Sequence, residues 1–122
     1  MAIERIIKER GQCAFLARNR DIRDGLFNIY KGALYRLYDD HGELWMTVAV
    51  RRQLYHGIVV TDVASGLLVT AGTGAKTYND AVQDVSRQYE SVNNAMATDY
   101  YKKAVKLCQE EYDELRERGV LK

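Results

Sequence analysis

The chain has 122 residues, a formal net charge of +1, 47% hydrophobic residues and 29% charged residues, a composition typical of one globular domain over residues 1–122. Duplex nucleic acid is disfavoured as a partner, because proteins that bind it are usually far more basic in order to neutralise phosphates. No run of about 18 uncharged apolar residues occurs and the first ten residues lack a signal peptide's apolar segment, so we expect a cytoplasmic protein with no membrane partner.

Residues 1–31 are predicted to form a short helix and a loop. Ile3, Ile6 and Ile7 share one helical face and Gly11 is placed to end the helix. The segment 13–17 is compatible with either a short strand or a helical turn. The polar segment 18–24 is predicted to be a loop, and it contains Arg18, Arg20 and Arg23.

Strand patterns dominate residues 32–71. We predict strands over 33–38, 43–51, 55–63 and 67–70, which gives a four-stranded antiparallel meander. The cluster Asp39-Asp40-His41-Gly42-Glu43 combines carboxylates with an imidazole, but hairpin turns prefer Asp and Gly for backbone reasons, so we interpret it as a turn and not as a metal site.

Residues 77–118 are predicted to be helical, because apolar residues recur in steps of three and four along two consecutive stripes. The first stripe contains Tyr78, Val82, Val85, Tyr89, Val92 and Met96, and the second contains Ala97, Tyr101, Val105, Cys108, Tyr112 and Leu115. The stripes are out of phase, so the chain must turn or change phase near Asn93 and Asn94; a helical hairpin and one re-phased helix both remain open. The expected fold is α+β, with a short N-terminal helix, a four-stranded sheet and two consecutive long C-terminal helices packed on it.

Two long apolar stripes face one small sheet, and the second helix is long enough to extend beyond that sheet. We therefore predict a homo-oligomer. Its expected interface is the second stripe, comprising Tyr101, Val105, Cys108, Tyr112 and Leu115.

The glycine-rich link 72–77 precedes the first C-terminal helix and invites comparison with a phosphate-binding P-loop. The spacing fails, because Ala75 and Thr70 occupy the two positions at which a P-loop requires glycine. Thr77 is a good N-cap with Asp80 three residues later. The link is therefore interpreted either as a turn before a capped helix or as a helix start that holds an anionic group.

Arginines and tyrosines are interleaved through the first half of the chain, where Arg and Lys outnumber Asp and Glu by ten to seven over residues 1–60. Arginine pairs with phosphate through two hydrogen bonds and tyrosine stacks on a base, although both also occur as ordinary cross-strand pairs. Tyr30 and Tyr38 lie among these residues. The predicted ligand site comprises Arg18, Arg20, Arg23, Arg36, Arg51, Arg52, Tyr35, Tyr55, Gly72, Gly74, Lys76 and Thr77.

No catalytic or metal motif is evident. Cys13 and Cys108 have neither CxxC spacing nor a companion pair of histidines, so we expect two buried thiols, no metal and no cofactor. No nucleophile–base motif is present. The sequence therefore favours a protein that is not an enzyme.

The hairpin and the following residues 74–82, Gly-Ala-Lys-Thr-Tyr-Asn-Asp-Ala-Val, are similar to HicB-type antitoxins, whose sheet leads through a Gly/Thr turn into a helix that starts with an acidic residue and alanine. In size, order of elements and Arg/Tyr content, the whole chain resembles small phage-encoded counter-defence proteins, particularly anti-Thoeris proteins. That resemblance implies an oligomer that sequesters a cyclic nucleotide signal in the cytoplasm of a bacterial host.

Two hypotheses follow. The first is a protein that binds a small phosphate-bearing ligand without changing it, at a site between protomers. The alternative is an interaction or inhibitor protein that blocks a macromolecular partner through its exposed sheet or a helical face, as antitoxins and nuclease inhibitors do.

Overall fold

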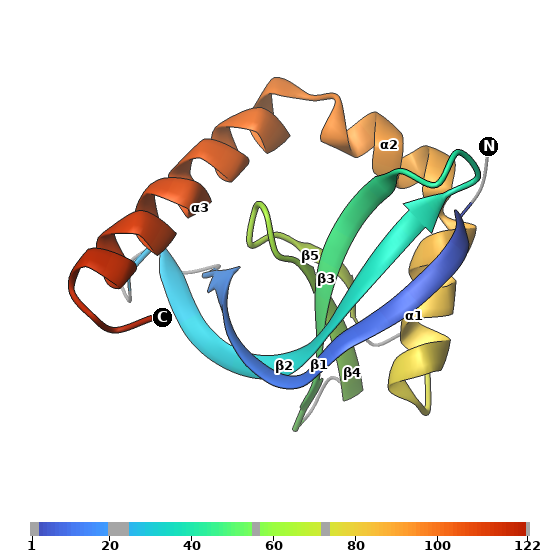
Figure 1. Cartoon of the computed structure of the whole chain (residues 1–122), viewed down its shortest axis with the longest axis horizontal. Coiled ribbons are helices and arrows are strands. Elements are labelled where there is room, and N and C mark those ends of the chain that lie inside the picture. The colour runs from blue at the N-terminus through green and yellow to red at the C-terminus, as the bar shows by residue number, and fades with distance from the viewer. Residues whose placement is uncertain (1–2, 20–24, 55–56, 72–73, 122) are drawn as a thin grey trace.

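The computed structural model describes residues 3–19, 25–54, 57–71 and 74–121. Its described elements form an α+β fold in which a five-stranded antiparallel sheet precedes the helices and the strands pair in sequence order (Figure 1). The strands are β1 (Ile3–Arg18), β2 (Phe27–Asp39), β3 (Leu44–Gln53), β4 (Gly57–Asp62) and β5 (Leu68–Ala71). The helices are α1 (Tyr78–Arg87), α2 (Tyr89–Met96) and α3 (Asp99–Glu117).

The predicted N-terminal helix is wrong, because these residues form the edge strand β1. Ile3 and Ile6 both pack against the main core, although residues three apart in a regular strand point to opposite faces. The register of β1 against β2 shifts between Ile3 and Arg5, and such a bulge inserts one extra residue and restores the common face. The sheet therefore has five strands and not the predicted four.

The sheet curls strongly, as the bending of β1 and β2 in Figure 1 shows. A Cβ atom on Gly32 in β2 would lie only 2.6 Å from the carbonyl oxygen of Val50 in β3, so glycine permits this close approach of two strands. At the end of β1, the Arg18 N–H donates to the carbonyl of Gly66 in the turn after β4, at 2.7 Å. The end of β1, which is one edge strand, thus lies beside the turn that leads to β5, the other edge strand.

Helix α1 covers one face of the sheet and completes the main core. The Thr77 hydroxyl accepts a hydrogen bond from the Asp80 N–H at 3.1 Å, so Thr77 is the N-cap that its sequence position predicted. The buried residues of this core are Ala33, Tyr35, Leu37, Met46, Val48, Val50, Ile58, Val60, Ala81, Val82 and Val85.

Three helices replace the two that were predicted. The first apolar stripe is divided at Gln88, which lies between α1 and α2. The predicted change of phase near Asn93 falls inside α2, and the chain turns later, at Ala97 and Thr98. There the Thr98 hydroxyl accepts from the Tyr101 N–H at 3.2 Å and starts α3, so the two stripes belong to separate helices that meet at an angle (Figure 1).

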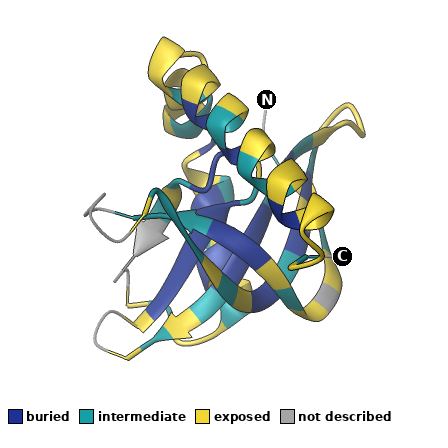
Figure 2. Cartoon of the chain, turned by 90° about the vertical axis from the view of Figure 1, so that its left-hand side faces the viewer, coloured by how far each residue is buried: buried dark blue, intermediate teal, exposed yellow. Residues whose placement is uncertain are grey.

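Helix α3 is exposed over most of its surface (Figure 2), and its buried stripe packs on the end of the curled sheet. Cys108 and Leu115 form a second, smaller core with Leu16 of β1. The Tyr112 hydroxyl accepts a hydrogen bond from the Leu16 N–H at 2.9 Å. Two residues of the predicted oligomer interface, Cys108 and Leu115, are therefore buried within the chain itself, while Tyr101, Val105 and Tyr112 are half-buried.

Within the described residues, no helix is both long enough and apolar enough to cross a membrane.

Candidate anion-binding site

A pocket of about 280 Å³ with both polar and apolar lining lies where the curled strands converge. All five strands or their ends contribute to it, since the end of β1 is held beside the turn after β4 by the Arg18–Gly66 hydrogen bond. The described lining residues are Ala17, Arg18, Asn19, Tyr30, Arg51, Gln53, Val59, Thr61, Gly66 and Leu68. The pocket therefore brings together two of the arginines that the sequence singled out.

Arg51 is the central side chain of this pocket. Its neighbour Val50 belongs to the main core, and because side chains alternate along a strand, Arg51 lies on the other face of β3. Its guanidinium carbon lies 3.7 Å from the centre of the Tyr30 ring on β2, a close cation–π contact. The stack explains how an arginine can be held in place on the sheet without an acidic partner.

The Arg51 guanidinium has unused hydrogen-bonding capacity. Its Nε atom is buried and has no hydrogen-bond partner, and no described carboxylate forms an ion pair with its remaining N–H groups. Buried donors in native proteins are nearly always paired, and leaving one unpaired costs roughly 1–3 kcal/mol. An exception of this kind indicates a site that an acceptor outside the described chain can complete.

Arg18 also lines the pocket, although strand alternation places its side chain on the same face of β1 as Leu16. It is the last residue of β1, and its guanidinium carbon lies 5.7 Å from the centre of the Phe27 ring. No aspartate or glutamate is among the described residues that line the pocket. The Arg51 guanidinium, with no carboxylate among the described lining residues, makes this pocket favourable for an anion.

The other described residues of the predicted ligand site lie elsewhere. Arg36 is paired with Glu9 through two hydrogen bonds of 2.9 and 2.8 Å. Arg52 lies on the opposite face of β3 from Arg51 and donates to the Lys76 carbonyl oxygen at 3.5 Å. Neither arginine lines the pocket, because Arg36 already has a carboxylate partner and strand alternation turns Arg52 away.

The described tyrosine and helix-start residues of the predicted ligand site also lie outside the pocket. Tyr35 is 6% exposed within the main core, so it cannot stack on a ligand, and burial raises the pKa of its hydroxyl. The Thr77 hydroxyl is used to cap α1, while Gly74 and Lys76 are exposed and do not line the pocket. Arg20, Arg23, Tyr55 and Gly72 lie outside the described residues.

Three polar residues of the pocket, Asn19, Gln53 and Thr61, were not singled out in the sequence. Thr61 is separated by one residue from Val59, and both line the pocket because they point to the same face of β4. Asn19 is held in place by a hydrogen bond to the carbonyl oxygen of Gly25 at 2.9 Å. Strand alternation was the signal that could have identified Gln53 beside Arg51, once the face of β3 was known.

The described residues offer little for acid–base or nucleophilic chemistry. No group of three or more His, Cys, Asp or Glu side chains among them is placed to hold a metal ion. Asp39 Oδ1 accepts hydrogen bonds from the N–H groups of His41 and Glu43, so this acidic cluster forms a turn. Burial, together with the nearby negative charges of Asp62 and Glu111, raises the pKa of Cys108 to about 12, which keeps its thiol protonated and a poor nucleophile.

Comparisons of the chain with protein-family models, with curated proteins and with solved structures found no match. Function is therefore inferred from the pocket itself.

Proposed function

We propose that this chain is a non-catalytic protein that binds a small phosphate-bearing ligand in the Arg18–Arg51 pocket. The observation that carries the proposal is the guanidinium of Arg51, which is stacked on Tyr30 and has a buried Nε without a hydrogen-bond partner. A side chain held in this state costs the free protein stability. Binding an anion would offset that cost by giving the charge a partner.

Phosphate suits the pocket because arginine presents a planar set of N–H donors that match the spacing of phosphate oxygens. Asn19, Gln53 and Thr61 add neutral polar groups around the Arg51 guanidinium. Hydrogen bonds to charged groups contribute about 1.5–3 kcal/mol each. Arg51 and these polar groups acting on one phosphate group can therefore support useful affinity in a pocket of this size.

Part of the pocket is apolar, which supports a ligand that also has a carbon framework, such as a nucleotide. Val59, Leu68 and the Tyr30 ring supply this surface. The Tyr30 ring is in contact with Arg51, so a base would be held by aliphatic contacts more than by stacking between two rings. This arrangement supports a nucleotide-like ligand, as the resemblance to counter-defence proteins implies.

The site that we propose is formed by one chain, whereas the sequence suggested a site between protomers. The described lining residues belong to one chain, and the proposal is stated for a single copy. Homo-oligomerisation is retained as a separate proposal. Light scattering would test it, and a wild-type mass equal to one chain would contradict it without affecting the ligand proposal.

Calorimetry with inorganic phosphate, pyrophosphate, nucleoside mono- and diphosphates and cyclic nucleotides tests the function. At least one of them should release or absorb heat with saturation at one ligand per chain. After the protein is denatured, mass spectrometry should recover the same ligand unchanged. Loss of the ligand to a product would instead identify an enzyme.

Matched variants assign the binding to the pocket. Arg51→Gln should weaken binding by about tenfold to a hundredfold, the equivalent of 1.5–3 kcal/mol. Arg52→Gln is the control, since it removes the same charge from the next residue on the opposite face of β3. Equal weakening by Arg51→Gln and Arg52→Gln would mean that only net charge matters, and no binding by any phosphate compound would favour the alternative interaction protein.

A further inference from the structure

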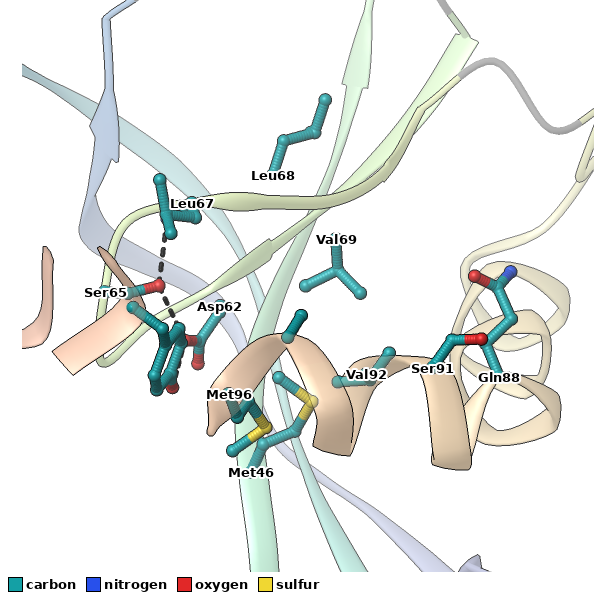
Figure 3. A pocket seen from close by; sticks show the side chains of 12 residues that line it. Met46, Asp62, Ser65, Leu67, Leu68, Val69, Gln88, Ser91, Val92 and Met96 are labelled. Carbon is teal, nitrogen blue, oxygen red and sulfur yellow. Dashed lines mark hydrogen bonds between the residues drawn. The ribbon is translucent and has the colours of Figure 1, made fainter. Parts of the chain in front are cut away.

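A second pocket, of about 260 Å³, lies between the β4–β5 hairpin and α2 (Figure 3). In the figure, Leu67, Leu68 and Val69 lie on one side of the space, and Met46, Val92 and Met96 lie on the other. Two methionines give the wall adaptable side chains that adjust to the shape of a guest. The space is slightly smaller than the usual range for drug-sized ligands, about 300–1,000 Å³, so it suits a small molecule.

Asp62 lies at one end of this apolar space and is the one charged residue among the described residues that line it. The residue is 3% exposed. Within the described parts of the chain, no lysine, arginine or histidine forms an ion pair with it. A carboxylate buried without a cation is unusual, because removing a charge from water costs several kcal/mol unless it is paired.

The two oxygens of the Asp62 carboxylate are not equally used. Oδ2 accepts from the Ser65 hydroxyl at 2.7 Å and from the Tyr101 hydroxyl at 2.6 Å. Oδ1 accepts from the Ala64 N–H at 3.4 Å, a long contact that contributes little. Oδ1 therefore keeps acceptor capacity while the negative charge has no described counter-ion.

We propose that this pocket binds a small apolar molecule with a primary ammonium group, of the alkylamine class. The ammonium would pair with Asp62, and the alkyl chain would lie between the two methionines and Val69. An ammonium supplies what the carboxylate lacks, namely a positive charge with strong N–H donors. The inference is independent of the anion site, because neighbouring Thr61 and Asp62 point to opposite faces of β4 and line different pockets.

n-Pentylamine is the probe, with n-pentanol and pentanoate as partners of equal chain length. Binding is followed through the methyl NMR signals of Met46 and Met96, which line the pocket. The amine should shift both signals with saturation and bind at least tenfold more tightly than the alcohol, while pentanoate should not bind. Equal affinities for the amine and the alcohol would overturn the proposal, since the charge of Asp62 would then play no part.

Two variants locate the binding. Asp62→Asn removes the charge and should abolish the preference for the amine over the alcohol. Ala95→Leu adds a larger side chain to the wall from α2 and should weaken amine binding at least tenfold, whereas Ala97→Leu, just beyond the end of α2 and outside the wall, should leave it unchanged. If Asp62→Asn fails to fold, Ala95→Leu decides: amine binding unchanged in that variant would overturn the proposal.

Discussion

The hydroxyl of Tyr101, in the first turns of α3, donates a 2.6 Å hydrogen bond to Oδ2 of Asp62 at the end of β4. Burial and this hydrogen bond raise the pKa of the Tyr101 hydroxyl, so it remains a donor at every ordinary pH. The same oxygen accepts from Ser65 in the turn after β4. Asp62 thus joins the β4–β5 turn to α3, and two residues far apart in sequence fix the position of the last helix.

Tyr101→Phe should lower the free energy of unfolding by about 1.5–3 kcal/mol, because it removes a hydrogen bond to a buried charged group. Urea denaturation monitored by circular dichroism measures the change. Tyr100→Phe is the matched control, since Tyr100 is 66% exposed on the same helix and should change stability by less than about 0.5 kcal/mol. Equal effects of the two substitutions would contradict an anchoring role for Tyr101.

Gly32→Ala should destabilise the protein by about 1–3 kcal/mol, the usual cost of overpacking. The added methyl would lie 2.6 Å from the Val50 carbonyl oxygen and 3.0 Å from a ring carbon of Phe15, so two strands must separate. Gly11→Ala in β1 is the control, because its Cβ meets no heavy atom within 4 Å. Chemical denaturation of both variants should show a loss for Gly32→Ala alone; equal stability would mean that the sheet adjusts without cost.

The meander from β2 to β5 was predictable from the sequence because its strands alternate and its turns carry suitable residues. The Asp39–Gly42 turn has the expected Asp and Gly, and Gly42 adopts a positive φ of 77° that favours glycine. The start of the chain was not predictable in the same way. Ile3 and Ile6 fit a helical spacing, and the bulge that makes this spacing compatible with a strand depends on pairing with β2, which is not a local property.

The helical half shows a similar division between local and non-local information. The two stripes and the Thr77 cap were recognised because both are local patterns. The turn before α3 was misplaced, since Thr98 was not recognised as a second N-cap. Whether the stripe of α3 packs on its own sheet or on a second copy depends on where β1 ends, and that position is a property of the curled sheet.

Only part of the candidate site could be anticipated. Arg18 and Arg51 were among the predicted ligand residues, but periodicity alone did not separate Arg51 from Arg52. That choice requires knowing that Val50 faces the main core. The convergence of Arg18 with Arg51 needs the curl of the whole sheet, because the two residues lie on β1 and β3 with β2 between them.

Stability should fall between pH 8 and pH 10 in a way that depends on Cys108. Burial raises the pKa of Cys108 from 9.0 in the unfolded chain to about 12 in the fold. The contribution of this group is therefore complete below pH 9 and is lost as the pH rises from 9 towards 12. The loss from this group alone is about 1 kcal/mol between pH 8 and pH 10. Urea denaturation at both pH values measures this, and the free energy of unfolding of Cys108→Ala should fall by that much less than the free energy of the wild type. Equal falls in the two proteins would show that the thiol does not contribute.

Asn93→Ala should loosen the contact between α2 and β3. The indole N–H of Trp45 donates to Asn93 Oδ1 at 2.6 Å, and this is the one tryptophan of the chain, so its fluorescence reports on the contact. The substitution should lower the free energy of unfolding by about 0.5–1.5 kcal/mol and change the emission spectrum of the folded protein. Asn94→Ala on the exposed side of α2 should do neither, and an unchanged spectrum in Asn93→Ala would contradict the assignment.

Arg51→Met should stabilise the free protein while weakening phosphate binding. Methionine keeps an unbranched side chain over the Tyr30 ring but has no N–H groups and no charge. The substitution loses a cation–π contact, which contributes about 0.5–2 kcal/mol, and it removes a buried unpaired donor, which costs about 1–3 kcal/mol. The second quantity is larger, so we expect a net gain of up to about 1 kcal/mol.

The sign of this change separates a structural role for Arg51 from a ligand-binding one. If the stack on Tyr30 served the fold alone, Arg51→Met would destabilise the protein by about the value of the cation–π contact, and phosphate compounds would have no effect on either variant. Thermal melting with and without the phosphate compound that binds best by calorimetry tests both parts. At a ligand concentration one hundred times the wild-type dissociation constant, the wild type should gain about 2.7 kcal/mol, whereas Arg51→Met, with binding weakened tenfold to a hundredfold, should gain only about 0.4–1.4 kcal/mol from a higher starting stability.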